Sequence, residues 1–194
     1  FNGKYHQVSN MTLSPKAIQA PHPPLWIGAR GPKAIRRAAE MGANLMTTLG
    51  PDPAPLYIDT LKELGKDPAN FKIAQLRMVY CADSEDQAWE DIQHHLAHVF
   101  GYYEAVLKEA GDVEGDELSM PYNSPEEIRD SVLAETAIMA GTVEQVADKM
   151  SDFKKNFECT DFILSSHFAG IDPRKSSYSN ALFAKHVMPK FKAS

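Results

Sequence analysis

The residues best placed to do chemistry form a short turn, Gly28-Ala29-Arg30-Gly31, which joins an apolar segment to a helical pattern. Pro32 suits the first position of a helix, because its ring fixes φ and its missing N–H is not needed there. The free N–H groups and the dipole at such a helix start attract anions, and Arg30 adds a positive charge. The turn is therefore a candidate phosphate site, although the Gly-x-x-Gly spacing alone favours a plain strand-to-helix connection.

Arg77 and His167 are the two candidate catalytic side chains. Arg77 shares one face of an apolar strand with Gln75. Since a parallel strand is normally apolar on both faces, this face is predicted to line a polar interior or a site. There Arg77 would contact an anion or a substrate; the alternative is a carboxylate partner at the strand end. His167 follows another apolar strand and titrates near neutral pH, so it is either an acid–base group or a satisfied, partly buried histidine.

His94 and His98 share a face of a predicted helix, at a spacing that also occurs in metal sites. The segment lacks the glutamate of a His-Glu-x-x-His motif and offers no obvious third ligand. We therefore predict a solvated helix face here and no metal site.

These candidates are positioned by strands and helices that alternate four times along the chain. The predicted strands cover residues 25–27, 43–48, 71–82 and 162–165. Such alternation predicts a parallel sheet with right-handed crossovers. An eight-stranded barrel typically takes about 250 residues, so four units correspond to half of one. The predicted fold class is α/β, a TIM-type (β/α)8 barrel of which this chain covers about the last four βα units.

Helix signals lie between these strands. Ser84 with Gln87 and Thr142 with Gln145 form capping boxes, which mark two helix starts. The helix after Ser84 is predicted to run to Gly111. Its inward face is predicted to contain Trp89, Ile92, Leu96, Val99, Tyr103 and Val106. Leu56, Ile58, Leu61 and Leu64 mark a shorter helix that is predicted to end at Gly65.

The chain is predicted to be the C-terminal portion of one barrel domain. Its parts are a hairpin remnant with a proline-rich connector (1–24), three βα units (25–111), an acidic loop with a short helix (112–141), and a final helix–strand–helix (142–194). Asn2-Gly3 is a strong hairpin signal with Tyr5–Val8 as its second strand, but no first strand precedes it. The chain is therefore expected to begin inside a longer protein.

Composition narrows the class of protein. The chain has 194 residues, a formal net charge of −6 and 43% hydrophobic residues, which suits one soluble domain. The acidic balance argues against nucleic acid and anionic membranes as partners. No apolar run approaches the roughly 18 residues of a membrane helix. Two cysteines, Cys81 and Cys159, form no disulfide framework, so a cytoplasmic location is expected.

Several stretches together resemble one known family. Residues 14–28 read Ser-Pro-Lys-Ala-Ile-Gln-Ala-Pro-His-Pro-Pro-Leu-Trp-Ile-Gly, and a helix with Ala-Ala and Gly follows. Near the C-terminus, 140–146 read Ala-Gly-Thr-Val-Glu-Gln-Val and 182–191 read Leu-Phe-Ala-Lys-His-Val-Met-Pro-Lys-Phe. This pattern resembles the C-terminal half of the luciferase-like monooxygenases, which are flavin- or deazaflavin-dependent barrel enzymes.

The resemblance implies a function and a cofactor site. Family members use reduced FMN and O2 to oxygenate a small organic substrate, and a deazaflavin branch uses F420 for hydride transfer. Gly28, Ala29, Arg30 and Gly31 match the turn that holds the flavin phosphate, and Thr48 and Leu49 match positions that line the isoalloxazine pocket. Many members have Gly-Ser-Ser where this chain has Ala-Arg-Gly, so Arg30 would replace hydroxyl contacts with charge. An Arg-Gly-Pro turn also occurs in the deazaflavin branch, which leaves FMN and F420 both open.

The resemblance also implies partners. The family's catalytic residues near the flavin ring lie on early strands that this chain lacks, so the isolated chain is expected to be inactive. Expected partners are a small-molecule substrate, a flavin reductase, and either a complementing N-terminal half or further copies of the chain. The non-enzymatic alternative is a half barrel without cofactor that self-associates through unpaired strand edges at Leu25 and Phe162.

Overall fold

The computed structural model describes residues 1–48, 52–110 and 124–191. Its strands are β1 (Trp26–Gly28), β2 (Asn44–Thr47), β3 (Ile73–Cys81), β4 (Ile138–Gly141) and β5 (Asp161–Ser165). Its α-helices are α1 (Pro32–Glu40), α2 (Ala54–Glu63), α3 (Glu85–Ala110), α4 (Val132–Thr136), α5 (Val143–Asn156) and α6 (Pro173–Leu182). Short helical turns are η1 (Pro68–Asn70), η3 (Pro125–Asp130), η4 (Phe183–Val187) and η5 (Met188–Lys190). None of these helices is at once long and apolar enough to be a membrane-spanning segment.

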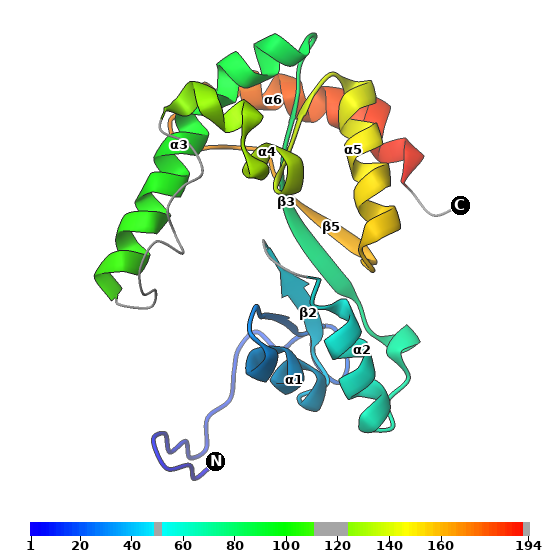
Figure 1. Cartoon of the computed structure of the whole chain (residues 1–194). Helices are drawn as coiled ribbons and strands as arrows, with labels where there is room; N and C mark the ends of the chain where they lie inside the picture. The colour runs from blue at the N-terminus through cyan, green and yellow to red at the C-terminus, as the bar shows by residue number, and fades with distance from the viewer. Residues whose placement is uncertain (49–51, 111–123, 192–194) are drawn as a thin grey trace.

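The named strands form one parallel sheet, and the four predicted strand–helix units are present in order (Figure 1). The strand order is β1-β2-β3-β4, and β5 also pairs with β3. The prediction of an α/β fold with a parallel sheet is therefore confirmed.

β3 is the strand on which the others are assembled. β2 pairs with it along Ile73–Gln75, β4 along Met78–Cys81, and β5 along Ala74–Met78. β5 pairs with residues of β3 that also pair with β2 and with β4. β5 therefore occupies one edge of β3, and β2 and β4 lie end to end along the other edge. In Figure 1, β3 runs from the group of β1, β2, α1 and α2 to the group of α3 to α6.

β4 was not predicted from the sequence. β2 ends at Thr47, which is paired with Gln75, so the remaining backbone groups on that edge of β3 need another partner. The four residues of β4 satisfy them, and all four are buried.

The two faces of the sheet have different surroundings. Helices α1, α2 and α5 cover one face, where Leu45, Ile73 and Val79 are buried; we call this the outer face. Side chains alternate along a strand, so Leu76 and Met78 lie on the opposite, inner face. Those two are only half-buried. On the inner face of the neighbouring strands, Trp26 and Ile163 are 39% and 36% exposed.

The first two helices begin and end as the sequence predicts. Pro32 opens α1, and Gly42 and Gly65 follow α1 and α2 at positive φ of 68° each. Tyr57 and Leu61 of α2 are fully buried, whereas Leu64, which follows the helix, is 45% exposed. The Tyr57 hydroxyl donates to the Ala43 carbonyl at 2.6 Å, which ties α2 to the chain entering β2.

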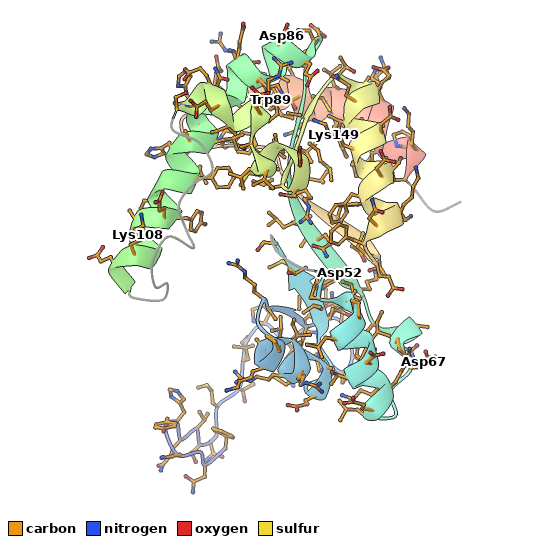
Figure 2. All side chains as sticks on the ribbon, in the orientation of Figure 1. Asp52, Asp67, Asp86, Trp89, Lys108 and Lys149 are labelled. Atoms are coloured by element: carbon orange, nitrogen blue, oxygen red, sulfur yellow. The ribbon has the colours of Figure 1, made fainter. Side chains whose placement is uncertain are left out.

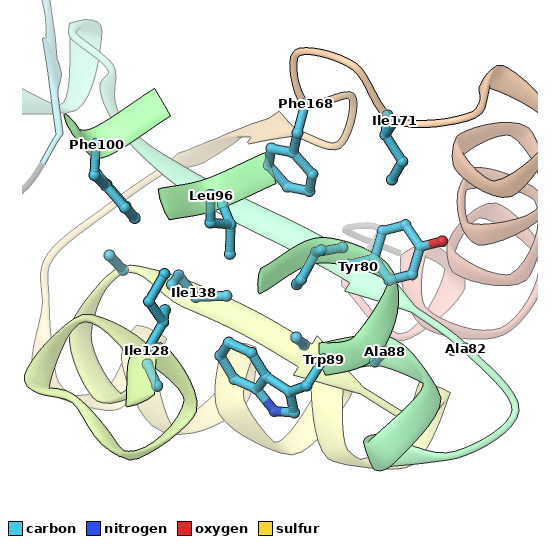
Figure 3. Close-up of a cluster of buried hydrophobic side chains, with 14 residues drawn as sticks. Tyr80, Ala82, Ala88, Trp89, Leu96, Phe100, Ile128, Ile138, Phe168 and Ile171 are labelled. Carbon is cyan, nitrogen blue, oxygen red and sulfur yellow. The ribbon is translucent and has the colours of Figure 1, made fainter. Parts of the chain in front are cut away.

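Helix α3 covers the inner face of the sheet around Tyr80 of β3 and Ile138 of β4. Trp89, Leu96 and Phe100 pack against Tyr80, Ile138 and Phe168 in one buried cluster (Figure 3). Tyr103 and Val106 were predicted to face inward, and this was wrong, because they are 58% and 40% exposed. A helix of 26 residues is about 39 Å long, longer than the nine-residue β3, so its last turns extend past the sheet.

Local signals elsewhere had mixed outcomes. Thr142 and Gln145 form both hydrogen bonds of the predicted capping box. Pro125–Glu135 was predicted as one short helix and is instead η3 followed by α4.

At the N-terminus, a single antiparallel bridge joins Asn2 to Gln7, and Gly3 N–H donates to the His6 carbonyl at 2.8 Å. The turn therefore spans Gly3–His6 rather than Asn2-Gly3. Phe1 and Asn2 form the first side of the hairpin and pair with Gln7 and Val8 on the second side.

Candidate functional site

The candidate phosphate turn connects β1 to α1 at the carboxyl end of the sheet. Ala29 is buried, and its N–H donates to the Met46 carbonyl at 3.0 Å, which continues the pairing of β1 with β2. The amides of Ala34 and Ile35 both donate to the Gly31 carbonyl, at 3.0 and 3.1 Å. Within residues 1–48, 52–110 and 124–191, no group accepts a hydrogen bond from the Gly31 or Lys33 amide. These amides, rather than that of Ala29, are the donors open to a ligand.

The surroundings of this helix start fit an anion. Arg30 is exposed, and the first turn of α1 holds no acidic residue. A Cβ added at Gly31 would meet no atom within 4 Å, so space is open at the N-terminus of the helix. A phosphate dianion placed there would be attracted by the exposed amides, the helix dipole and the Arg30 charge.

Thr48 lies at the same edge of the sheet. Gly28 is paired with Met46, so Thr48 follows β2 close to where the phosphate turn follows β1. The Thr48 side chain is exposed, and its carbonyl accepts a hydrogen bond from Arg77 Nη1 at 2.9 Å. Leu49, the second predicted pocket residue, lies outside the described residues, as does the acidic segment 112–117.

Gln75 and Arg77 do not face the barrel interior, so that part of the prediction is wrong, whereas contact of Arg77 with an anion or a substrate stays a prediction. Both side chains lie on the outer face, and Arg77 is 3% exposed with its guanidinium 4.1 Å from the centre of the Phe153 ring of α5. Nη1 donates to the carbonyls of Thr48 and Leu76, the latter at 2.7 Å. The carboxylate partner was also wrong as far as the described part of the chain goes. Burial lowers the pKa of Arg77 from its usual value.

His167 is exposed where the chain leaves β5. Its Nδ1 lies 3.0 Å from Oγ of Ser176, a residue of α6 that is 3% exposed. This contact fixes the ring against α6 while leaving the side chain accessible, so an acid–base role for His167 stays a prediction.

Two of the histidines of α3, His94 and His95, contact groups of the protein itself. His94 Nε2 lies 3.6 Å from Oε1 of Glu126, and His95 Nδ1 lies 3.0 Å from the Ala169 carbonyl. Among the residues described, no group of three or more His, Cys, Asp and Glu side chains is arranged to hold a metal ion.

Lys149 and Trp89 are notable polar residues that sequence reasoning missed. Lys149 is half-buried on α5, donates to the Ala140 carbonyl at 3.0 Å, and has a pKa lowered by burial. The sequence indicates the burial of Lys149 only weakly, through its position four residues before the apolar Phe153 on the same face of a helix. Trp89 was predicted only as a packing residue.

Comparison with known proteins settles the family. A family model described as luciferase-like monooxygenase matches residues 1–157. The chain belongs to this family. This luciferase-like chain is 25% identical, over 168 residues, to the oxygenase component of flavin-dependent trigonelline monooxygenase from Acinetobacter baylyi; the match covers 79% of the chain and 45% of that protein.

Two solved structures resemble the whole fold of this luciferase-like chain. One is coenzyme F420-dependent tetrahydromethanopterin reductase from Methanopyrus kandleri, with a TM-score of 0.67, 19% identity, and coverage of 99% of this chain and 58% of that one. The other is the oxygenating constituent of 3,6-diketocamphane monooxygenase from Pseudomonas putida, in complex with FMN. Its TM-score is 0.66 at 19% identity, with coverage of 88% and 50%.

The luciferase-like chain thus spans about half the length of the proteins it matches. The predicted family is confirmed, and so is the predicted partial TIM-type barrel. At these identities, the two solved structures show the fold alone.

Proposed function

We propose that this chain is the C-terminal part of a flavin-dependent oxidoreductase that uses reduced FMN and O2 to oxygenate a small organic substrate. The family supports oxidoreductase chemistry in general, and the curated relative is named as a flavin-dependent monooxygenase. The observation that carries the cofactor proposal is the start of α1, where exposed amides, Arg30 and open space at Gly31 suit a phosphate group.

Each group has a defined part in this proposal. The Gly31 and Lys33 amides would donate to the phosphate, and the Arg30 guanidinium would balance its charge. Thr48 would lie beside the ring system, held by the bond from Arg77 to its carbonyl. Bound reduced FMN would supply the electrons that activate O2, and the protein would orient it and exclude water.

The second candidate is hydride transfer with F420. Two observations favour it: one solved structure of the same fold is an F420-dependent reductase, and the turn contains Arg30-Gly31-Pro32 instead of small hydroxyl residues. Both cofactors carry a phosphate on the ribityl chain, so the start of α1 suits either one.

The partners are part of the proposal. The curated relative is an oxygenase component, which suggests that a flavin reductase supplies reduced flavin. The exposed inner-face residues Trp26 and Ile163 suggest that a complementing N-terminal half, or a second copy, completes the barrel. The isolated chain would then hold phosphate without turning over. Unpaired Cys81 and Cys159 agree with a cytoplasmic location.

Binding of the flavin phosphate at the start of α1 is tested by titrating the purified protein with FMN and with riboflavin, which lacks the phosphate. Flavin fluorescence reports the binding. Arg30→Ala should weaken FMN binding by about fivefold, the equivalent of an exposed ion pair, and leave riboflavin binding unchanged. Arg37→Ala is the matched control, because Arg37 is exposed at the other end of α1.

Equal effects of the two variants on FMN would show that Arg30 is only surface charge. A parallel titration with F420 separates the two cofactors, since the preferred one should bind more tightly. The reaction class is then read in the full-length protein, as O2 consumption with reduced FMN or as substrate-dependent oxidation of reduced F420.

A further inference from the structure

His167 lies at the edge of the sheet where a barrel of this type places its reactive groups. It is two residues past the end of β5, and the strands are parallel, so it belongs to the same carboxyl edge as Gly28–Gly31 and Thr48. Catalytic residues of TIM-type barrels come from the ends of several strands at this edge. The His167 side chain is exposed, and its Nδ1 faces Oγ of Ser176 at 3.0 Å. What His167 can do there depends on which ring nitrogen carries the proton.

The chain that follows His167 is held in place. Phe168 is 2% exposed and packs in the buried cluster beneath α3. The Ala169 carbonyl lies 3.0 Å from Nδ1 of His95, and the Ile171 amide donates to the Phe168 carbonyl at 3.1 Å. The exit from β5 is therefore a packed turn, and the backbone that carries the His167 ring has a defined position.

Ser176 is held in place from the side of α6. Its neighbour Lys175 pairs with Asp91 of α3, and Ser179, one turn further on, accepts the Cys81 N–H at 2.8 Å. Figure 2 shows α6 beside the first turns of α3. Ser176 itself is 3% exposed, so water has little access to its hydroxyl group. Both partners of the contact with His167 are thus on fixed backbone.

The Ser176 hydroxyl proton has one acceptor in the described part of the chain. A Ser or Thr hydroxyl within a helix can donate to the carbonyl four residues earlier. Thr60, Thr136 and Ser151 do so, at 2.7, 2.7 and 2.9 Å. Ser176 differs, because Nδ1 of His167 is the hydrogen-bond partner found for its Oγ among the described residues. Buried donors are normally satisfied, so the hydroxyl donates to Nδ1, which must then be without a proton.

Two other histidines have the opposite assignment. Nδ1 of His95 lies 3.0 Å from the Ala169 carbonyl, and Nδ1 of His22 lies 2.8 Å from the Pro23 carbonyl. A carbonyl oxygen can only accept, so Nδ1 carries the proton in both rings. The chain therefore contains both neutral forms of histidine, and the group that faces Nδ1 decides between them.

We propose that Ser176 is a positioning residue that holds His167 as the neutral Nε2–H tautomer, and that His167 is a hydrogen-bond donor to the ligand at this edge rather than a base. Nε2 has no partner among the described residues and belongs to an exposed side chain, so its N–H is free for an oxygen or nitrogen acceptor. A base needs an unprotonated nitrogen that faces the ligand, and here that nitrogen is covered by Ser176. The tautomer is a property of this chain, whereas the role of donor rests on the proposed function.

The tautomers are read from long-range ¹H–¹⁵N spectra of the purified chain at pH 9, where histidine side chains are neutral. We expect His167 to carry its proton on Nε2, and His95 and His22 to carry theirs on Nδ1 as internal references. The signal of His167 is assigned by its loss in His167→Gln. A proton on Nδ1 of His167 in the wild-type chain would overturn the proposal without any further variant.

Substitutions of Ser176 test what fixes the tautomer. Ser176→Ala should give a mixture of both tautomers, because each ring nitrogen can then be donor or acceptor toward water. Ser176→Thr keeps the hydroxyl and should keep the proton on Nε2. Ser177→Ala is the matched control, since Ser177 is the next residue of α6 and is exposed. Unmoved His95 signals show that the fold is kept. If Ser176→Ala then leaves the His167 signal as Ser177→Ala does, Ser176 does not set the tautomer and the proposal fails.

The role of donor is tested by turnover of the full-length protein, followed as O2 consumption with reduced FMN. His167→Ala should lower the rate about tenfold, the equivalent of one hydrogen bond. His167→Gln can still donate but cannot act as a base, so it should restore most of that loss. Equal losses in the two variants would indicate a base, and no loss in either would indicate no role; both results overturn the role of donor. A wild-type protein without turnover would contradict the proposed function instead, and the tautomer spectrum would still decide the assignment.

Discussion

The Ser179 side chain of α6 accepts a backbone hydrogen bond from the last residue of β3, on the edge where β5 has already ended. β5 ends at Ser165, which is paired with Met78, so Cys81 has no strand beside it on that edge. The Ser179 hydroxyl accepts the Cys81 N–H at 2.8 Å, and the two residues are 1% and 0% exposed. Ser179→Ala should therefore leave a buried backbone N–H without an acceptor.

The size of the effect follows from two opposing terms. An orphaned buried amide costs about 1–3 kcal/mol. Alanine is a better helix former than serine, which returns about 0.5 kcal/mol. The expected net loss is about 1.5 kcal/mol in the free energy of unfolding, or about 3–6 °C in Tm for a domain of this size.

Urea unfolding followed by far-UV circular dichroism measures this loss. Ser177→Ala is the matched control, because Ser177 is exposed two residues earlier on the same helix and gains only the helix-propensity term. If Ser179→Ala and Ser177→Ala have the same unfolding midpoint, α6 does not cap β3 and the reasoning is refuted.

Two further predictions concern neighbouring residues. Gly141→Ala should destabilise the fold by about 1–3 kcal/mol in urea unfolding, because Gly141 has φ of +141° and a Cβ there would lie 2.5 Å from Gln145 Oε1; an unchanged midpoint would mean that the turn relaxes freely. Burial raises the pKa of Cys81 from 9.0 to about 11, and the unfolded chain releases the thiol proton first. The free energy of unfolding should therefore fall as pH rises from 9 to about 11, by up to about 1.4 kcal/mol per unit. Cys81→Ala should remove this part of the pH dependence, and an identical pH profile in the variant would contradict the assignment.

The sequence predicted those features whose causes are local. Pro32 and Gly42 bound α1 because each has a backbone preference of its own, and Thr142 with Gln145 caps α5 through bonds between residues three apart. The alternation of strands and helices was enough to predict a parallel sheet. The open amides at the start of α1 were predictable for the same reason, since they belong to the helix start itself, and their binding of a phosphate stays a prediction.

Features that depend on distant parts of the chain could not be predicted in this way. A period of two shows that Gln75 and Arg77 share a face, but not which face the helices cover. β4 exists because an edge of β3 is left open where β2 stops, and its four residues carry too little pattern to be recognised alone. The contact of His167 with Ser176 depends on how α6 packs against the exit of β5, so no spacing in the sequence predicts it.

The pairing of β3 with β4 has a consequence for how members of such a family diversify. Residues 82–137 leave the sheet at the end of β3, and the chain returns as β4 against that strand, with Cys81 paired to Gly141. The excursion therefore leaves at the end of β3 and returns beside the same strand, where Ile138 is paired with Met78. Lengthening it would change the closure entropy only logarithmically, by about 0.6 kcal/mol for each doubling, and would leave the register of the barrel strands untouched. Insertions and deletions can accumulate there while the paired strands of the sheet stay the same.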